Sequence, residues 1–181
     1  MYIYFDNITL QFIGGKMDIT YRLPLANEIN GVSKQIMISY TSAYKELMDK
    51  DYLTTLQEDH WIPILKESLQ NGDTCLIAEC NGEVVGSTVF SVINEVENTY
   101  AEWHAFYLLP NYIGLGVGHS FYLSIEEEMI KQGCNFCILE VLSSNLRAIQ
   151  FYVSHGFTKT ETFTVQEYGM TLTCDKMKKV F

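Results

Sequence analysis

The sequence predicts a mixed α/β domain in which an antiparallel meander precedes a β-α-β unit. Hydrophobic residues recur at spacings of three and four over residues 26–70, which is typical of amphipathic helices. Three strand-like runs follow at residues 74–80, 83–93 and 99–110, and Asn81-Gly82 between the first two is a strong hairpin signal. Helix and strand patterns then alternate from residue 111 to 157.

The first half of the chain opens with an extended piece, residues 1–16, and a second possible beginning follows at Met17. We therefore expect an N-terminal extension over 1–16 and one compact domain over 17–181. Two helices are expected between 26 and 70, and Asn71-Gly72-Asp73 ends the second. The residues that recur at these spacings are Ile29, Val32, Ile36, Ser39, Tyr40 and Tyr44 in the first helix and Trp61, Ile64, Leu65 and Leu69 in the second.

The second half alternates more regularly. After the long strand, which Pro110 ends, a glycine loop leads into a helix from about Gly116 to Gln132. Residues 134–141 read as the next strand, and a helix follows with Asn145 as its N-cap and Gly156 as its stop. Residues 158–181 complete the predicted order with two final strands.

Composition limits the classes of function. The chain has 181 residues, 48% of them hydrophobic, and a formal net charge of −10, so it can bury one core but lacks a broad basic surface for nucleic acid. No apolar run reaches the ~18 residues that a membrane helix needs. The start of the chain lacks the basic region of a secretion signal. We therefore expect a cytoplasmic protein without nucleic-acid or membrane partners.

The five cysteines are an odd number, which favours reduced thiols. Cys134 and Cys137 have the spacing of a redox or zinc half-site, but no second such motif follows. We expect them to be residues of a hydrophobic strand and expect no metal.

The glycine loop has Gly114, Gly116 and Gly118 at alternate positions before a helix. The first N–H groups of a helix lack internal partners, and glycines let an anion approach them, so the loop can bind phosphate through its backbone. It can equally be a turn that only permits close packing. It lacks the lysine of a nucleoside-triphosphate loop, and His119 occupies the last glycine position of a dinucleotide fingerprint. Because Glu140 ends the next strand at a suitable distance, a dinucleotide-binding oxidoreductase remains an alternative.

Two motifs in order carry a family resemblance. "FYLLPNYIGLGVG" has a strand, a proline and a loop with small residues at Gly116 and Gly118, and "NLRAIQFYVSHGF" matches the pattern N-x-x-A-x-x-F-Y-x-x-x-G-F. Both resemble the GCN5-related N-acetyltransferase (GNAT) superfamily, and the resemblance extends over roughly residues 17–181. It implies a twisted mixed β-sheet of six to seven strands flanked by about four helices, splayed between the two central parallel strands.

The resemblance also implies an activity. Acetyl-CoA would be the donor, and a primary amine of a small molecule or peptide would attack its thioester directly, which makes the chain an acyltransferase. A homodimer is an assembly common in the family. A GNAT-like domain that binds CoA without turnover is the alternative from a different class.

The resemblance assigns roles to individual residues. Tyr152 falls on the position of the general acid that protonates the departing thiolate, and Glu140 on that of a general base, for which Glu102 and His104 are alternatives because they alternate on one face of a strand. The expected cofactor-binding residues are Tyr107, Leu108, Leu109, Ile113, Gly114, Leu115, Gly116, Val117, Gly118, His119, Asn145, Arg147 and Tyr152. Ile113 and Leu115 stand where the family usually has polar or basic residues, so Arg147 is the nearest candidate cation for a CoA phosphate.

Overall fold

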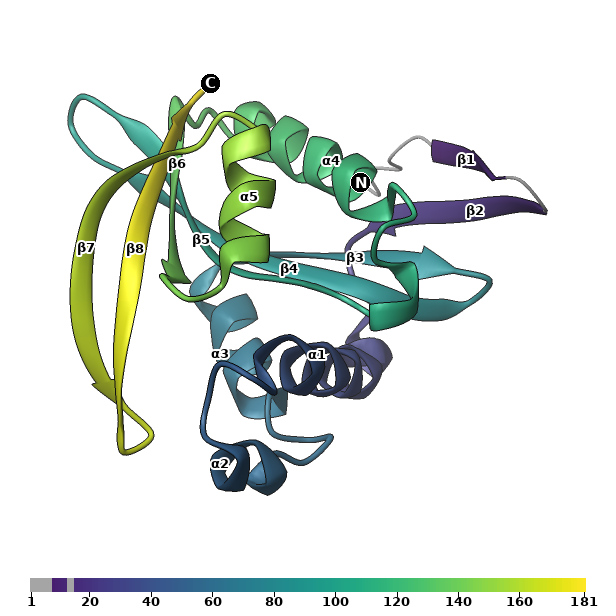
Figure 1. Cartoon of the computed structure of the whole chain (residues 1–181). Helices are drawn as coiled ribbons and strands as arrows, with labels where there is room; N and C mark the ends of the chain where they lie inside the picture. The colour runs from purple at the N-terminus through teal and green to yellow at the C-terminus, as the bar shows by residue number, and fades with distance from the viewer. Residues whose placement is uncertain (1–7, 13–14) are drawn as a thin grey trace.

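The computed structural model describes residues 8–12 and 15–181, with side chains from Met17 onward. Figure 1 shows a single twisted sheet with helices on both faces. The strands are β1 (Ile8–Phe12), β2 (Gly15–Arg22), β3 (Thr74–Cys80), β4 (Glu83–Asn94), β5 (Thr99–Leu108), β6 (Phe136–Leu142), β7 (Thr158–Glu167) and β8 (Met170–Val180). The α-helices are α1 (Ile29–Tyr44), α2 (Lys50–Thr55), α3 (Ile62–Asn71), α4 (Val117–Lys131) and α5 (Leu146–Ser154), with short 3₁₀ turns at Ala26–Glu28 and Pro110–Tyr112.

The sheet has the strand order β1-β2-β3-β4-β5-β6-β8-β7. Only β5 and β6 are parallel, and all other neighbours in the described sheet are antiparallel. The predicted mixed α/β architecture is confirmed, with seven strands in β2–β8 and β1 as an eighth at the edge. The described chain has one α-helix more than the four expected, because Asp49 caps the short α2 by accepting a hydrogen bond from the Tyr52 N–H at 2.9 Å.

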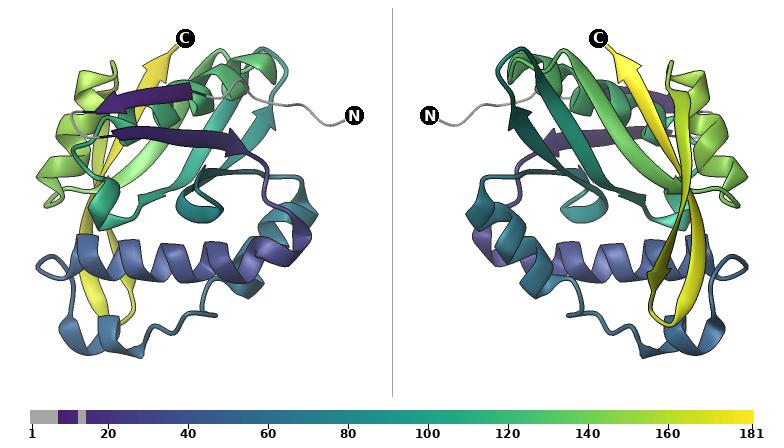
Figure 2. Two further views of the ribbon diagram at one scale, coloured as in Figure 1. Left: turned by 90° about the vertical axis from the view of Figure 1, so that its right-hand side faces the viewer. Right: turned by 90° about the vertical axis from the view of Figure 1, so that its left-hand side faces the viewer.

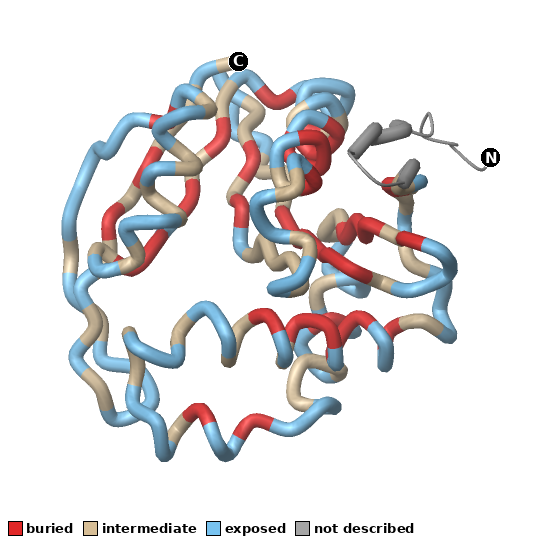
Figure 3. Tube along the Cα trace, turned by 45° about the vertical axis from the view of Figure 1, so that its right-hand side comes forward, coloured by how far each residue is buried: buried red, intermediate tan, exposed pale blue. Residues whose placement is uncertain are grey.

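Helices cover both faces of the sheet, and the two cores beneath them differ in size. Helices α4 and α5 lie on one face and α1 and α3 on the other, as the two side views show (Figure 2). The larger core cluster lies under α4, where Phe121 and Ile125 are fully buried, and the smaller one lies under α1, around Val32 and Ile36. Buried residues concentrate between the layers, whereas most of β7 is exposed (Figure 3). We call the face that carries α1 and α3 the far face.

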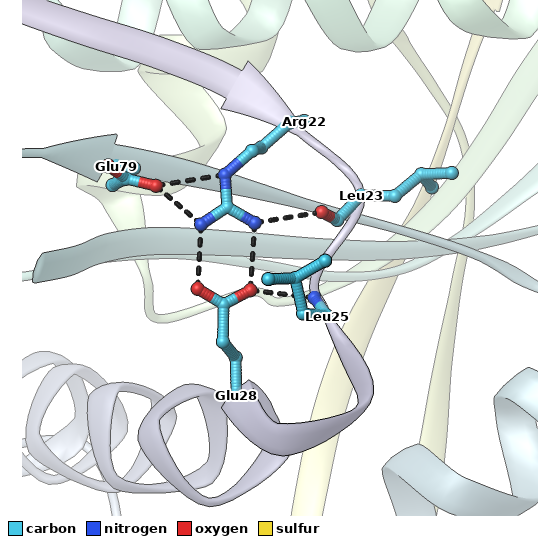
Figure 4. Close-up of polar contacts among 5 residues, drawn as sticks. All are labelled: Arg22, Leu23, Leu25, Glu28 and Glu79. Carbon is cyan, nitrogen blue, oxygen red and sulfur yellow. Dashed lines mark hydrogen bonds and ion pairs between the residues drawn. The ribbon is translucent and has the colours of Figure 1, made fainter. Parts of the chain in front are cut away.

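An arginine joins β2, β3 and the start of α1 (Figure 4). The Arg22 guanidinium donates to both carboxylate oxygens of Glu28, at 2.7 and 2.6 Å, and also to Glu79 on β3, at 2.8 Å from Nε. These charge-assisted bonds lower the pKa of the Glu28 carboxyl below its usual range. The network therefore sets where the chain leaves β2 and enters α1.

The central parallel strands pair over a short stretch and then separate. Cα pairing of β5 with β6 runs from Tyr100–Phe136 to Trp103–Leu139. Beyond that point β5 stays with β4, with Leu108 opposite Gly86, while β6 stays with β8, with Glu140 opposite Lys176. The predicted splay between the two parallel strands is confirmed, and we call it the fork.

The predicted local signals lie where they were expected. Asn81 and Gly82 have φ of 51° and 83°, the positive values of a tight hairpin turn between β3 and β4. Strand β2 begins at Gly15, two residues before the expected domain boundary at Met17. Residues 1–7 and 13–14 of the expected extension lie outside the described residues.

Candidate active site

The fork opens into a cavity of about 870 Å³. Its walls come from the C-terminal end of α1, the end of β5, the glycine loop with the start of α4, the end of β6, and α5. Ten of the predicted cofactor-binding residues line it: Tyr107, Leu108, Ile113, Gly114, Gly116, Gly118, His119, Asn145, Arg147 and Tyr152. The structure therefore brings most of the motif residues to one cavity.

The glycine loop presents open backbone to this cavity. Gly114 and Gly116 have φ of +81° and +80°, a region that L side chains rarely adopt, and a Cβ on either would meet no atom within 4 Å. Helix α4 begins at Val117, and the N–H of Ser120 is bonded to the Gly116 carbonyl at 3.1 Å. The N–H groups before Ser120 lack a partner one turn back within the helix, so they are available at the positive end of its dipole.

The apolar residues of the loop divide between two environments. Leu109 and Leu115 pack against the main core and Val117 is fully buried in it, so these three predicted cofactor residues lie outside the cavity lining. Only the backbone of these residues can serve a ligand there. Ile113, in contrast, is 36% exposed and lines the cavity. The absence of a basic side chain at position 115 therefore has a packing reason, whereas position 113 faces the site.

Basic side chains reach the cavity from other elements. Lys45, Arg147, His119 and His155 all line it. The two histidines are joined at 2.8 Å between His119 Nδ1 and His155 Nε2. His155 Nδ1 lies 2.7 Å from the Phe151 carbonyl, which can only accept, so Nδ1 is the protonated nitrogen and Nε2 accepts from His119 when His155 is neutral. His155, which the sequence analysis did not place in the site, thus belongs to the cavity wall.

Asn145 is confirmed as the N-cap of α5. Its Oδ1 accepts from the Ala148 N–H at 3.2 Å. Tyr44, at the end of α1, lines the cavity together with Tyr107 and Asn145, and burial raises the pKa of its phenol. Three phenols, Tyr44, Tyr107 and Tyr152, therefore line the cavity around the cap of α5.

Tyr152 lies on α5 in an aromatic environment. Its ring contacts Trp103 at 5.5 Å and Phe157 at 5.7 Å between centroids. Burial, followed by the nearby Tyr44 phenol and Cys137 thiol, raises the pKa of Tyr152 above its ordinary value, so the hydroxyl carries its proton at neutral pH. No described residue shares a hydrogen bond with this hydroxyl. Tyr152 therefore has a proton and no partner inside the protein to compete for it.

The three predicted base candidates meet at a second opening of the fork, on the far face. Glu102, His104 and Glu140 line a smaller cavity of about 280 Å³, together with Lys176. His104 and Glu140 also line the large cavity, whereas Glu102 does not. The Glu140 carboxylate lies 3.6 Å from Lys176 Nζ. Glu140 and the His104 imidazole thus border both cavities, whereas Glu102 borders only the smaller one.

Three residues of this region were absent from the predicted site. Tyr44 was expected only as part of the apolar face of a helix, and its i, i+4 spacing from Tyr40 gave no sign of a cavity. Asp73 and Ser91 make a hydrogen-bond chain to His104, yet they stand 31 and 13 positions away and belong to no motif. Only the pairing of β3, β4 and β5 brings them together.

Cys137 lies in β6, as expected, whereas Cys134 was expected in the same strand and instead precedes it. All five are free thiols in the structure. Cys134 and Cys137 are buried near β6, and burial raises the pKa of both thiols. Within the described residues, no group of three or more His, Cys, Asp and Glu side chains is placed to hold a metal ion. No helix there is long and apolar enough to cross a membrane.

Comparison with known proteins agrees with this geometry. The model of the acetyltransferase (GNAT) family matches residues 37–157, about two thirds of the chain. The chain therefore belongs to the acetyltransferase (GNAT) family, and the predicted class, an acyltransferase, is confirmed. A search of curated proteins finds no significant match.

Solved structures share the fold at low sequence identity. The PaiA N-acetyltransferase of Thermoplasma acidophilum in complex with coenzyme A has a TM-score of 0.72 and 21% identity, and the match covers 90% of this chain and 99% of that one. YncA of Salmonella typhimurium, a putative acetyltransferase with its cofactor acetyl-CoA, has a TM-score of 0.66 and 20% identity. The match covers 90% of this chain and 93% of that one. Arabidopsis thaliana Naa50 in complex with the bisubstrate analogue CoA-Ac-MVNAL has a TM-score of 0.62 and 16% identity. The match covers 90% of this chain and 99% of that one.

Proposed function

We propose that this chain transfers the acetyl group of acetyl-CoA to a primary amine of a small molecule or peptide by direct attack on the thioester. The observation that carries the proposal is the placement of Tyr152. Its protonated hydroxyl, which no described residue engages, lines a cavity whose other end is the open backbone at the start of α4. A proton donor and an anion site in one cavity are what transfer from a phosphate-bearing thioester requires.

The residues present suit acetyl-CoA as the donor. Its pyrophosphate fits the N–H groups at the start of α4, where the positive φ of Gly114 and Gly116 keeps side chains away. Arg147 supplies a cation from α5, and the His119–His155 pair lines the same cavity. The pantetheine arm follows the edge of β5 near Tyr107, which has lost its β6 neighbour, and reaches Asn145.

The proposed chemistry uses one proton donor and one proton acceptor. Attack of a neutral amine on the thioester carbonyl breaks the C–S bond, and the Tyr152 hydroxyl protonates the sulfur as the electron pair leaves with it. An amine that arrives as an ammonium ion must first lose a proton to a base. Glu140 lines the cavity for that purpose, with His104, which also lines it, and Glu102, which lines the smaller cavity, as alternatives.

Two measurements test this function. Acetyl-CoA should raise the melting temperature of the purified chain, since a ligand that binds the folded state stabilises it. A free-thiol assay with a panel of amines should show CoA release. Binding without thiol release from any amine would favour the non-catalytic CoA-binding domain, and stabilisation by NAD but not acetyl-CoA would favour the oxidoreductase.

We extend the proposal to domain limits, location and assembly. Strand β1 pairs only with β2 at the sheet edge, which supports residues 1–16 as an extension of a domain over 17–181. Removal of residues 1–16 should leave acetyl transfer intact, and loss of folding would refute it. The five free thiols support a cytoplasmic location, and light scattering tests the homodimer.

A further inference from the structure

A bulge places His104 at the fork. On β4, Val89 is opposite Ala105 and Phe90 is opposite Trp103, so His104 is an extra residue of β5 without a Cα partner on β4. Bulges re-aim side chains and are common beside active sites. The last pair of β5 with β6 is Trp103–Leu139, which makes His104 the first residue of β5 beyond the fork. Its exposed side chain lines both cavities.

A hydrogen-bond chain holds the imidazole from the far face. His104 Nε2 lies 2.7 Å from Ser91 Oγ, and Ser91 Oγ donates to Asp73 Oδ1 at 2.6 Å. Asp73 directly follows the C-cap of α3, and its N–H is bonded to the Ser68 carbonyl at 3.0 Å. The chain from Asp73 to His104 is therefore anchored at its carboxylate end by a helix terminus.

The direction of these bonds determines the tautomer of His104. An ionised carboxylate only accepts, so the single proton of the Ser91 hydroxyl goes to Asp73. The Ser91 oxygen must then accept from His104, which places the imidazole proton on Nε2. Nδ1 of a neutral His104 is left with a lone pair. A histidine with one nitrogen held as a donor and the other unprotonated has the arrangement of a general base.

We propose that Asp73 and Ser91 position His104 as the group that takes the proton from the incoming amine, a role that rests on the proposed acetyl transfer. The alternatives are less suitably placed. Glu140 already faces the Lys176 ammonium at 3.6 Å, and Glu102 does not line the large cavity. His104 is the base candidate that both lines this cavity and is oriented by hydrogen bonds through Ser91 to Asp73.

The proton and electron pairs balance in this scheme. The ammonium gives one proton to Nδ1 of His104, and the free amine forms the new C–N bond. The C–S electron pair leaves on sulfur, which takes the proton of Tyr152, and the second amine proton returns to the Tyr152 oxygen. His104 then releases its proton to water. One ammonium and one thioester thus give one amide, one thiol and one proton.

The first experiment measures thiol release by the full chain with 1,4-diaminobutane, L-lysine and a short peptide with a free N-terminus. With the best of these, His104→Gln should lower kcat about 100-fold, the low end for lost acid–base catalysis, with an unchanged KM for acetyl-CoA. With 2,2,2-trifluoroethylamine, which is already uncharged at neutral pH, the loss should be less than about tenfold because no prior deprotonation is needed. An equal loss with both kinds of amine would overturn the role as base.

The second experiment tests the positioning residues. Ser91→Ala should lower kcat about tenfold in the wild-type background and cause no further loss in His104→Gln, since the hydroxyl acts only through the imidazole. Asp73→Asn should change kcat in the same direction by less. Ser87→Ala is the matched control on β4, because its hydroxyl donates to Gln35 and not to His104, and it should leave kcat unchanged.

The outcomes distinguish the proposed role of His104 from the proposed acetyl transfer. Stabilisation by acetyl-CoA shows that each variant is folded. Two results would overturn only the role of His104 and of the residues that position it. One is full kcat in His104→Gln while the wild-type chain releases thiol, and the other is additive losses from Ser91→Ala and His104→Gln. An about 100-fold loss in Glu140→Gln or Glu102→Gln alone would assign the base there. A wild-type chain that releases no thiol from any amine would overturn the proposed function itself.

Discussion

The two ends of the fork are built in different ways. At the end under α4 and α5, most lining residues come from two local motifs, at 107–119 and 144–155, and much of what the first offers a ligand is backbone. The far-face end combines Asp73, Ser91, His104 and Glu140, which stand on or beside four different strands. A site made of helix N–H groups can be recognised from a local motif, because glycines and a helix start suffice. A proton relay between side chains requires the sheet to be assembled first.

Loss of the Tyr152 hydroxyl should have the largest effect. Tyr152→Phe keeps the ring packing against Trp103 and Phe157 but removes the acid, so kcat should fall by about 100-fold or more. The dissociation constant of CoA, measured by calorimetry, should stay the same. A variant with normal kcat would show that water or another group protonates the thiolate. The end of the fork under α4 and α5 would then bind the cofactor without supplying the acid.

A side chain at the start of α4 should weaken the backbone site. Gly116→Ala forces an L residue to φ of +80°, which costs about 1–2 kcal/mol. We expect a loss of that size in the free energy of unfolding and a higher CoA dissociation constant. Gly118→Ala is the control, because its new Cβ would meet Phe151 at an ordinary 3.7 Å. Equal effects of both substitutions would contradict the role assigned to the backbone conformation.

Acid should weaken the anchor of the loop before Asn145. Asp175 on β8 accepts hydrogen bonds from Ser143 at 2.7 Å and Thr162 at 2.8 Å, and these bonds lower its pKa. A lowered pKa in the folded state stabilises the fold above the unfolded value of about 3.9, and this stabilisation is lost as pH falls through the folded pKa. Asp175→Asn should therefore be less stable than the wild type at pH 7. Denaturant titrations should show the difference shrinking below about pH 4.

A new cation at position 113 should produce the smallest change. Ile113 lines the cavity and is partly exposed, so Ile113→Arg should lower the CoA dissociation constant a few-fold, with a dependence on salt. Leu115→Arg is the contrasting variant, because Leu115 packs against the core, and it should destabilise the fold instead. No change for Ile113→Arg would mean that Arg147 already supplies the charge.

Much of the fold was predictable because its signals are local. The Asn81-Gly82 turn, the Asn145 cap and the glycine loop each act within a few residues of themselves. Short α2 was not predicted, since one capping residue before six helical residues leaves little periodicity to detect. The bulge at His104 was also missed, because an extra residue in a strand is visible only against the register of its neighbour.

The sequence by itself determined the mixed α/β architecture and the family resemblance, and it predicted most of the residues that line the α4–α5 end of the large cavity, including Tyr152 and the start of α4. These depend on hydrogen-bonding and packing preferences that extend over one turn or one strand. Only the tertiary structure decided that Leu115 belongs to the core, that Ile113 faces the cavity, and that Ser91 and Asp73 reach His104. The physical reason is that a side chain's partner across a sheet is set by strand order and register, which bring together residues far apart in the chain.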